Sequence, residues 1–244
     1  MKSVTESLTL RSAFQKIGWA PIITATGIVL TIAVSFILIA ANAFPDGKHI
    51  LSTKFVLIFL SLFLISAPAL SCLGFAQARK AFADTKAGKA FASLKWLFLV
   101  FTIIGCLSLI TLLLQPDTTA PIGKAPEKWA ILGLIYLIIN ILFLMCFIVS
   151  LPFVWSYLSH IADTTNIESM RYCVRASRYI TFTFCGHIAA MVIAGIIGSQ
   201  ALSYFLGFII LNLYFFSLRL WLKSWLSCAH EVSSHPIEAV KTDN

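Results

Sequence analysis

The sequence predicts an all-α protein, built as a polytopic membrane helix bundle with six transmembrane helices. Three observations predict this class. Apolar residues make up 59% of the 244 residues and charged residues only 11%, whereas soluble domains average about 45–50% and 25%. Mean hydropathy is +0.91, and a single soluble core could not bury that much apolar surface. The apolar residues also form six long continuous runs, whereas membrane β-strands alternate apolar and polar residues.

Each of the six runs is long enough to cross the bilayer as a helix, since about 20 apolar residues span roughly 30 Å of hydrocarbon. A helix also satisfies its own backbone polar groups inside lipid. None of the six contains Asp or Glu. The first run is longer than the h-region of a signal peptide, so we expect a span that is not cleaved. The expected spans are residues 21–43, 55–77, 97–115, 129–156, 180–198 and 204–225, in a single membrane domain over 1–228 with a polar cytoplasmic tail over 229–244.

The basic residues predict the orientation. Of the 18 Lys and Arg residues, only Lys48, Lys54, Lys124 and Lys128 fall in the first and third loops. The other 14 lie in the alternate loops and at the two ends, and cytoplasmic segments carry this excess. Both termini are therefore predicted to be cytoplasmic. Topology explains the net charge of +8, so no nucleic-acid partner is expected.

Six tryptophans fall at span ends, where an indole prefers the headgroup level of a bilayer. Five of them lie on the expected cytoplasmic side. They are Trp19, Trp96, Trp129, Trp155, Trp221 and Trp225.

An internal repeat is suggested at an offset of 84 residues, where Ser66-Ala67-Pro68 aligns with Ser150-Leu151-Pro152. A weaker third copy matches Ala13-Phe14 to Ala90-Phe91 at an offset of 77. These matches are in phase with the expected spans. They predict possible tandem helical hairpins, each introduced by a short interfacial helix.

The introductory segments have an amphipathic pattern. In the first, an apolar face is formed by Leu10, Ala13, Phe14 and Ile17. In the last, Thr165 with Glu168 resembles a capping box. One face after it holds Met170, Cys173, Val174 and Ser177, and another holds Arg171, Arg175 and Arg178. The pattern is typical of a helix lying on the membrane with its cations toward anionic headgroups. With Arg219 and Lys223, these arginines form the expected anionic-lipid interface. The alternative is that each segment simply extends the next span.

The polar linker after Pro152 leads to Ile167-Glu168-Ser169-Met170 and then Arg175-Ala176-Ser177-Arg178, which open a long apolar pair. This arrangement resembles the YciC-like bacterial integral membrane proteins and the related membrane domain of some glycerophosphodiesterases. In that group a motif with Ala-Leu and a later Ser starts the helix after a proline-ended span; here Met170 stands where Ala-Leu would begin. The resemblance covers most of the chain by architecture and few residues by motif. It implies a multi-pass protein of the bacterial inner membrane and carries no catalytic residues.

Three polar residues within the spans are the candidate functional residues, namely Asn140, His187 and Asn212. They could line a polar path, or they could form hydrogen bonds between packed helices. We favour packing. No span holds a carboxylate, which ion-coupled carriers usually keep, and no Gly-rich loop suggests a channel filter.

A stripe of small residues on the fifth span predicts close helix packing, against the sixth span through a turn at 199–203 or in a homodimer. It is formed by Gly186, Ala190, Ala194 and Gly198. The six cysteines show no CxxC spacing and are expected to be unpaired. Of these, Cys173 and Cys228 are juxtamembrane, where redox or acyl modification is conceivable.

These features predict a non-enzymatic integral inner-membrane protein, either a structural or accessory subunit or a lipid-facing envelope factor. Its expected partners are the bilayer and possibly a membrane protein or a second copy. No P-loop, HExxH or Ser-His-Asp pattern occurs, so no cofactor or metal is expected. A metal cluster of His230, Glu231, His235 and Glu238 is the alternative to a frayed tail, and we assign these residues to the tail. The alternative is a permease or export subunit for an apolar or lipid-like substrate, with a path near Asn140, His187 and Asn212. A lipid enzyme using His160, Asp163 and Arg171 is the third hypothesis.

Overall fold

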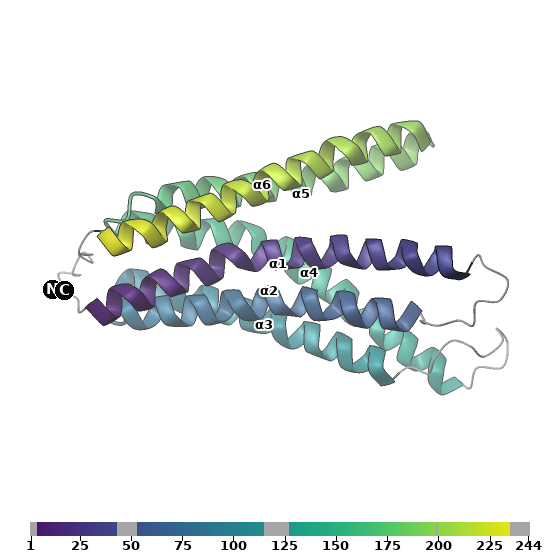
Figure 1. Ribbon diagram of the computed structural model, residues 1–244, viewed down its shortest axis with the longest axis horizontal. Helices are drawn as coiled ribbons and strands as arrows, with labels where there is room; N and C mark the ends of the chain where they lie inside the picture. Colours follow the sequence, from purple (N-terminus) through teal and green to yellow (C-terminus); the bar gives the residue numbers. More distant parts are fainter. Residues whose placement is uncertain (1–3, 43–52, 115–126, 199, 235–244) are drawn as a thin grey trace. The chain divides into compact units, whose positions relative to one another are not determined.

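The computed structural model consists of six long helices and describes residues 4–42, 53–114, 127–198 and 200–234 (Figure 1). No strand occurs in these ranges, so the predicted all-α class is confirmed. All six helices are long and apolar enough to cross a bilayer, which indicates a multi-pass membrane protein. The helices are α1 (Val4–Asn42), α2 (Thr53–Ala81), α3 (Lys86–Leu114), α4 (Glu127–Thr164), α5 (Met170–Ile197) and α6 (Gln200–Ser234).

The chain divides into two compact units, and helices α1 to α4 each contribute to both. Unit 1 holds Met1–Trp19, Leu73–Lys95 and Val149–Asn244, so it includes all of α5 and α6. Unit 2 holds Ala20–Cys72 and Trp96–Ile148. Each unit is described by itself below. The single membrane domain expected over 1–228 therefore stays a prediction.

The helices extend well past the predicted spans. Helix α1 is continuous from Val4, and α3 from Lys86, through segments that were expected to form separate interfacial helices. That prediction is wrong for the described residues, and the alternative of an extended span is correct. Near the C-terminus of the chain, α6 continues to Ser234, so the predicted tail begins later than residue 229. The predicted turn at 199–203 is also shorter, because α6 already begins at Gln200.

The helix extensions are continuous because their apolar faces are buried in protein. In α1, the face formed by Leu10, Ala13, Phe14 and Ile17 is completely buried within unit 1. A face that is already covered by other helices has no apolar surface left to place in lipid headgroups. The segment therefore packs as part of a bundle and does not need to lie on a membrane.

An aromatic cluster fills the interior of unit 1. The Trp225 ring centroid lies 5.5 Å from that of Phe14, 6.1 Å from Phe75 and 5.6 Å from Trp221. Phe91 joins the cluster through Phe75, at 6.3 Å. These residues come from α1, α2, α3 and α6, so the cluster holds four helices together.

Two of the tryptophans assigned to the headgroup level are instead core residues. Trp221 is 5% exposed and Trp225 is 0% exposed, because both lie inside this cluster. Trp19 and Trp96, by contrast, are largely exposed, as an interfacial indole would be. The side chain of Trp129 lies outside the described residues.

Trp221 also repairs a defect in the backbone of α1. Pro21 lies inside α1 and has no N–H, so the carbonyl of Ile17, four residues earlier, lacks its usual helical donor. The indole Nε1–H of Trp221 donates a hydrogen bond to this carbonyl at 3.1 Å. The bond joins α6 to α1 at a buried point.

Unit 2 is held by close approach at glycines. A Cβ added to Gly27 in α1 would collide with the ring of Phe63 in α2, and one added to Gly105 in α3 would lie 2.8 Å from Ile65 Cγ1. Any larger side chain would therefore push these helices apart. Many of the other apolar side chains of unit 2 are exposed, as expected of surfaces that face lipid.

The repeat holds for helix boundaries but not for buried faces. Helices α3 and α5 begin at Lys86 and Met170, which are 84 residues apart. However, buried Phe91 in α3 corresponds at this offset to Arg175, which is exposed. Buried Leu94 likewise corresponds to exposed Arg178. The two helices therefore turn different faces to the interior, and a tandem origin stays a prediction.

The bond from Trp221 gives a stability prediction with an internal control. Trp221→Phe should lower the free energy of unfolding by about 1–3 kcal/mol more than Trp225→Phe, because only the first leaves a buried carbonyl without a donor. The Trp225 Nε1 is buried and has no hydrogen-bond partner among the described residues, so its loss removes no bond. Thermal unfolding of the purified protein in mild detergent, followed by circular dichroism, measures the difference.

Pro21→Ala provides a second check, because an alanine at this position would supply the missing backbone N–H to the carbonyl of Ile17. In the Pro21→Ala background, Trp221→Phe and Trp225→Phe should cost nearly the same. Equal costs already in the natural background would refute the role assigned to the bond.

Candidate functional site

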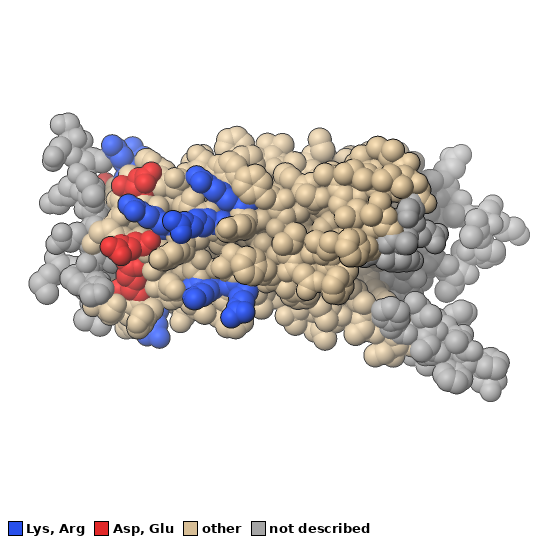
Figure 2. Space-filling model, turned by 90° about the horizontal axis from the view of Figure 1, so that it is seen from above, with Lys and Arg blue, Asp and Glu red and all other residues tan. Residues whose placement is uncertain are grey.

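The charged residues are segregated in the structure. Every Lys, Arg, Asp and Glu whose side chain is described belongs to unit 1. Figure 2 shows blue and red side chains gathered in one zone of the visible face. The zone includes the beginning of α5 and the second half of α6, and we call it the charged end of unit 1. In the described part of the chain, the charged side chains that could bind a ligand are therefore concentrated in unit 1.

The five cations of the expected anionic-lipid interface are all exposed at this end. They are Arg171, Arg175, Arg178, Arg219 and Lys223. The Arg178 guanidinium carbon lies 5.6 Å from the centroid of the Trp155 ring, which brings α5 and α4 together. That of Arg175 lies 5.8 Å from the Tyr172 ring on the same helix.

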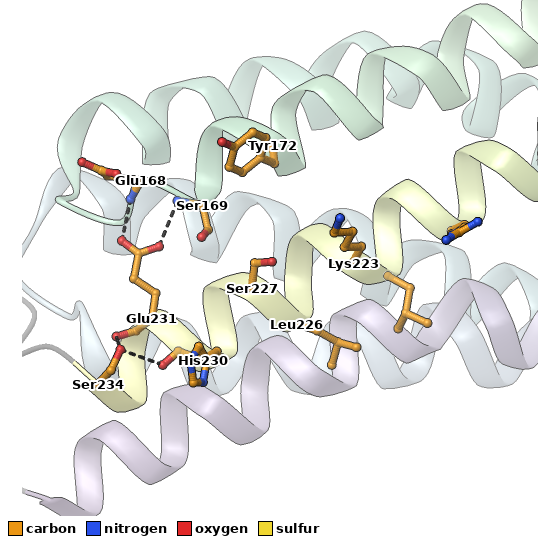
Figure 3. A pocket seen from close by; sticks show the side chains of 11 residues that line it. Glu168, Ser169, Tyr172, Lys223, Leu226, Ser227, His230, Glu231 and Ser234 are labelled. Carbon is orange, nitrogen blue, oxygen red and sulfur yellow. Dashed lines mark hydrogen bonds between the residues drawn. The ribbon is translucent and has the colours of Figure 1, made fainter.

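A groove of about 790 Å³ lies at the charged end, between the start of α5 and the second half of α6 (Figure 3). Glu168, Ser169 and Tyr172 form one wall. Residues of α6 spaced three, four or seven apart form the other, since these share one face of a helix. The α6 residues are Arg219, Leu222, Lys223, Leu226, Ser227, His230, Glu231 and Ser234.

Glu231 holds the two walls together. Its carboxylate accepts hydrogen bonds from the backbone N–H of Glu168, at 2.7 Å, and from that of Ser169, at 2.9 Å (Figure 3). These N–H groups precede the first turn of α5, where a negative charge is also favoured by the helix dipole. A carboxylate from α6 thus caps α5.

This cap replaces the capping box expected from Thr165 and Glu168, which is wrong. The N-cap of α5 is Ser169, whose side chain makes no capping bond. The Thr165 hydroxyl instead donates to the carbonyl of Ile161 at 2.8 Å. The sequence could not reveal the cap, because its acceptor lies 62 residues from Ser169.

A second, smaller pocket of about 470 Å³ lies beside the first on α5 and its preceding loop. Its lining includes Thr165, Asn166, Arg171 and Arg175. His160 and Asp163, which the lipid-enzyme hypothesis combined with Arg171, do not line it. The structure therefore does not bring that set of residues together in this pocket.

Asn140 pairs with a neighbouring helix. Its Nδ2 donates to Ser108 Oγ at 3.1 Å and to the carbonyl of Tyr136 at 2.8 Å. The first bond joins α4 to α3 inside unit 2. This contact is the packing role that the sequence favoured for Asn140.

Asn212 and His187 behave differently from each other. Asn212 is exposed on α6, and its Nδ2 bonds only to the carbonyl of Phe208 on the same helix. His187 on α5 lies 6.1 Å from the ring of Tyr214, and its Nδ1 is buried with no hydrogen-bond partner in the described part of the chain. Neither pocket is lined by Asn140, His187 or Asn212.

The small-residue stripe does not form a close contact along its length. Nothing lies within 4 Å of a Cβ placed on Gly186 or Gly198, whereas Ala194 is buried. Gly198 instead ends α5 with φ of 67°, and its N–H donates to the carbonyl of Ala194. Close approaches in unit 1 occur at Gly18, against Trp225, and at Gly74, against Ile17.

Two of the cysteines meet in the interior of unit 1. The sulfurs of Cys173 on α5 and Cys228 on α6 are 3.5 Å apart, and both side chains are fully buried. The sequence marked both as juxtamembrane but did not indicate that they meet. No group of three or more His, Cys, Asp or Glu side chains that could hold a metal ion is found within the described residues. His235 lies outside them.

The two asparagines give a matched pair of variants. Asn140→Ala should lower the free energy of unfolding by about 0.6–2 kcal/mol, because it removes an interhelical hydrogen bond. Asn212→Ala should change it by less than about 0.5 kcal/mol, because only a local bond is lost. Denaturant titration in detergent micelles measures both. A Ser108→Ala, Asn140→Ala double-mutant cycle with no coupling would contradict the pairing.

The cap of α5 gives a third prediction. Glu231→Ala should destabilise the protein by about 1–3 kcal/mol and speed hydrogen exchange at the amides of Glu168 and Ser169, since two charge-assisted bonds are lost. Glu168→Ala is the control, because its exposed carboxylate forms no hydrogen bond or ion pair with another described residue. Exchange detected by mass spectrometry on peptides covering 165–172 decides the matter, and unchanged rates in Glu231→Ala would refute the cap.

Comparisons with protein-family models, with curated proteins and with solved structures found no match for this chain. Its function must therefore be inferred from the residues and contacts of the chain itself.

Proposed function

We propose that this chain is a non-enzymatic integral protein of a bacterial inner membrane, with both termini cytoplasmic, which serves as a structural or accessory subunit in contact with lipid headgroups. The observation that carries the proposal is the segregation of charge. Exposed cations gather at the charged end of unit 1, while exposed apolar side chains cover much of the remaining described surface.

The physical basis is the negative surface potential of the cytoplasmic leaflet. Each Lys or Arg near an anionic membrane surface gains about 1 kcal/mol. The exposed arginines of α5 lie within its first nine residues, so they would stand where the helix leaves the hydrocarbon. Most of the fully buried side chains of unit 1 are aliphatic and aromatic, which supports a packed scaffold.

One observation favours the permease alternative. The buried Nδ1 of His187 has no partner among the described residues, and an unpaired polar atom in an apolar region costs free energy. A polar substrate group could satisfy it. Asn140, however, is already bonded to Ser108, and Asn212 to its own helix, which weighs against a path lined by all three.

The lipid contact is tested by the triple variant Arg171→Gln, Arg175→Gln, Arg178→Gln in vesicles. Phosphatidylglycerol should stabilise the natural protein against thermal unfolding relative to phosphatidylcholine, and the triple variant should lose much of that gain, because its cations are gone. The gain should also shrink at high salt. An equal gain in both proteins would refute the interface.

The permease alternative and the orientation have their own measurements. Cysteines placed at residues 140 and 212 should resist a membrane-impermeant maleimide, and labelling at both would favour a permease. A reporter fused after Asn244 should be active only in the cytoplasm; periplasmic activity would overturn the topology.

A further inference from the structure

We propose that the groove between α5 and α6 binds one amino-phospholipid, such as phosphatidylethanolamine, with its phosphate at Arg219 and Lys223 and its ammonium at Glu168. This proposal deepens the lipid contact proposed above and rests on it. It assigns a site, a lipid class and an orientation of the headgroup within the site.

The order of chemical groups along α6 matches the order within such a lipid. Phe208 and Phe216 are exposed and apolar, and Arg219 and Lys223 follow them on the same helix. Polar Ser227 comes next, followed by Glu231, whose carboxylate holds the backbone of Glu168 at the groove. An amino-phospholipid presents acyl chains, then a phosphate, then an ammonium group in the same sequence.

The spacing is compatible with a single headgroup. Glu168 is held beside Glu231 by its backbone N–H, and Glu231 lies eight residues beyond Lys223, which is about 12 Å along a helix. A lysine stem can shorten this gap, because it lies along the surface while its ammonium reaches outward. The two-carbon link between phosphate and ammonium is shorter than this separation, so one molecule contacts both ends only when the side chains of Lys223 and Glu168 extend toward it.

The cations are available to a ligand. Arg219 and Lys223 are both exposed and line the groove, and neither side chain forms a hydrogen bond or ion pair within the described ranges. An arginine and a lysine one helical turn apart can share one phosphate, the arginine through its planar fork and the lysine as a point charge.

The opposite end of the groove offers one free carboxylate. Glu231 uses both of its oxygens on the backbone of Glu168 and Ser169, so it has limited capacity for a further donor. Glu168 lines the same groove, is exposed, and its carboxylate forms no hydrogen bond or ion pair with another described residue. Ser169 and Tyr172 add polar atoms on this wall (Figure 3).

Charge complementarity selects this occupant over related ones. Phosphatidylglycerol carries the phosphate but no cation, so it could offer Glu168 only hydroxyl donors and no opposite charge. Phosphatidylcholine has a cation without N–H groups, so it cannot donate to a carboxylate. Free phosphate would use only the basic end and would gain nothing from the apolar face beside it.

Native mass spectrometry of the detergent-purified full chain tests the proposal. The probes are dioleoyl phosphatidylethanolamine, phosphatidylcholine and phosphatidylglycerol, with inorganic phosphate as competitor. We expect phosphatidylethanolamine to bind most tightly. Glu168→Gln should weaken its binding about two- to fivefold, as expected for an exposed ion pair, and leave phosphatidylglycerol binding unchanged.

The basic end is tested separately. Arg219→Gln and Lys223→Gln should each weaken all three lipids by about two- to fivefold, since every one of them carries the phosphate. The control is Lys89→Gln on α3, an exposed cation that does not line the groove, and it should change nothing.

Several results would overturn the proposal. These are equal binding of the three lipids, a preference for phosphatidylethanolamine that survives Glu168→Gln, full competition by inorganic phosphate, and lipid binding that is unchanged in Lys223→Gln. None of these results would change the outcome expected from the vesicle experiment, which tests the arginines of α5. Failure of the groove is therefore distinguishable from failure of the proposed lipid interface.

Discussion

The apolar faces that the helices carry at the charged end must be covered by protein, and this constraint organises unit 1. Exposed to water, such faces would lose the gain in free energy that comes from apolar burial. The structure covers them by continuing α1, α2, α3 and α6 into a shared interior, where the fully buried ring of Trp225 contacts Phe14 and Phe75. In this part the protein resembles a soluble helical core more than a membrane span. The cations are excluded from that interior and remain on its surface.

A second constraint follows, because each polar group in such an interior needs a partner. The Ile17 carbonyl, deprived of a donor by Pro21, finds the indole of Trp221. The hydroxyls of Thr183 and Ser217 pair with each other at 3.1 Å between α5 and α6. Among the described residues, the buried side-chain nitrogens left without a hydrogen-bond partner are those of His187 and Trp225. The two differ in their surroundings. The Trp225 ring packs in the aromatic cluster, whereas His187 on α5 contacts the single ring of Tyr214 on α6, so less packing compensates the cost of its unpaired nitrogen.

Sequence reasoning predicted what depends on local composition. Six apolar runs of sufficient length give six helices, because length and hydropathy alone decide whether a helix can span lipid. It could also identify the apolar face of residues 10–17 and the exposed arginines of α5, since both follow from helical periodicity. It failed where the partner lies far along the chain. The buried faces were assigned to lipid, and Glu231 was assigned to a frayed tail, because pairing between distant segments leaves no periodic signal.

The cap on α5 connects this architecture to the proposed lipid site. Glu231 binds the backbone of Glu168 and Ser169, so it fixes the distance between the two walls of the groove at its outer end. Cys173 and Cys228, in contact behind it, fix the same two helices from the interior. The groove is therefore bounded by contacts that exist without any ligand. A headgroup entering it would meet a largely preformed site, and less of its binding free energy would be lost in ordering the protein. The same contacts bring the carboxylate of Glu168 to the groove that holds Arg219 and Lys223, so the separation of charge that a zwitterionic headgroup requires is a consequence of how α5 is capped.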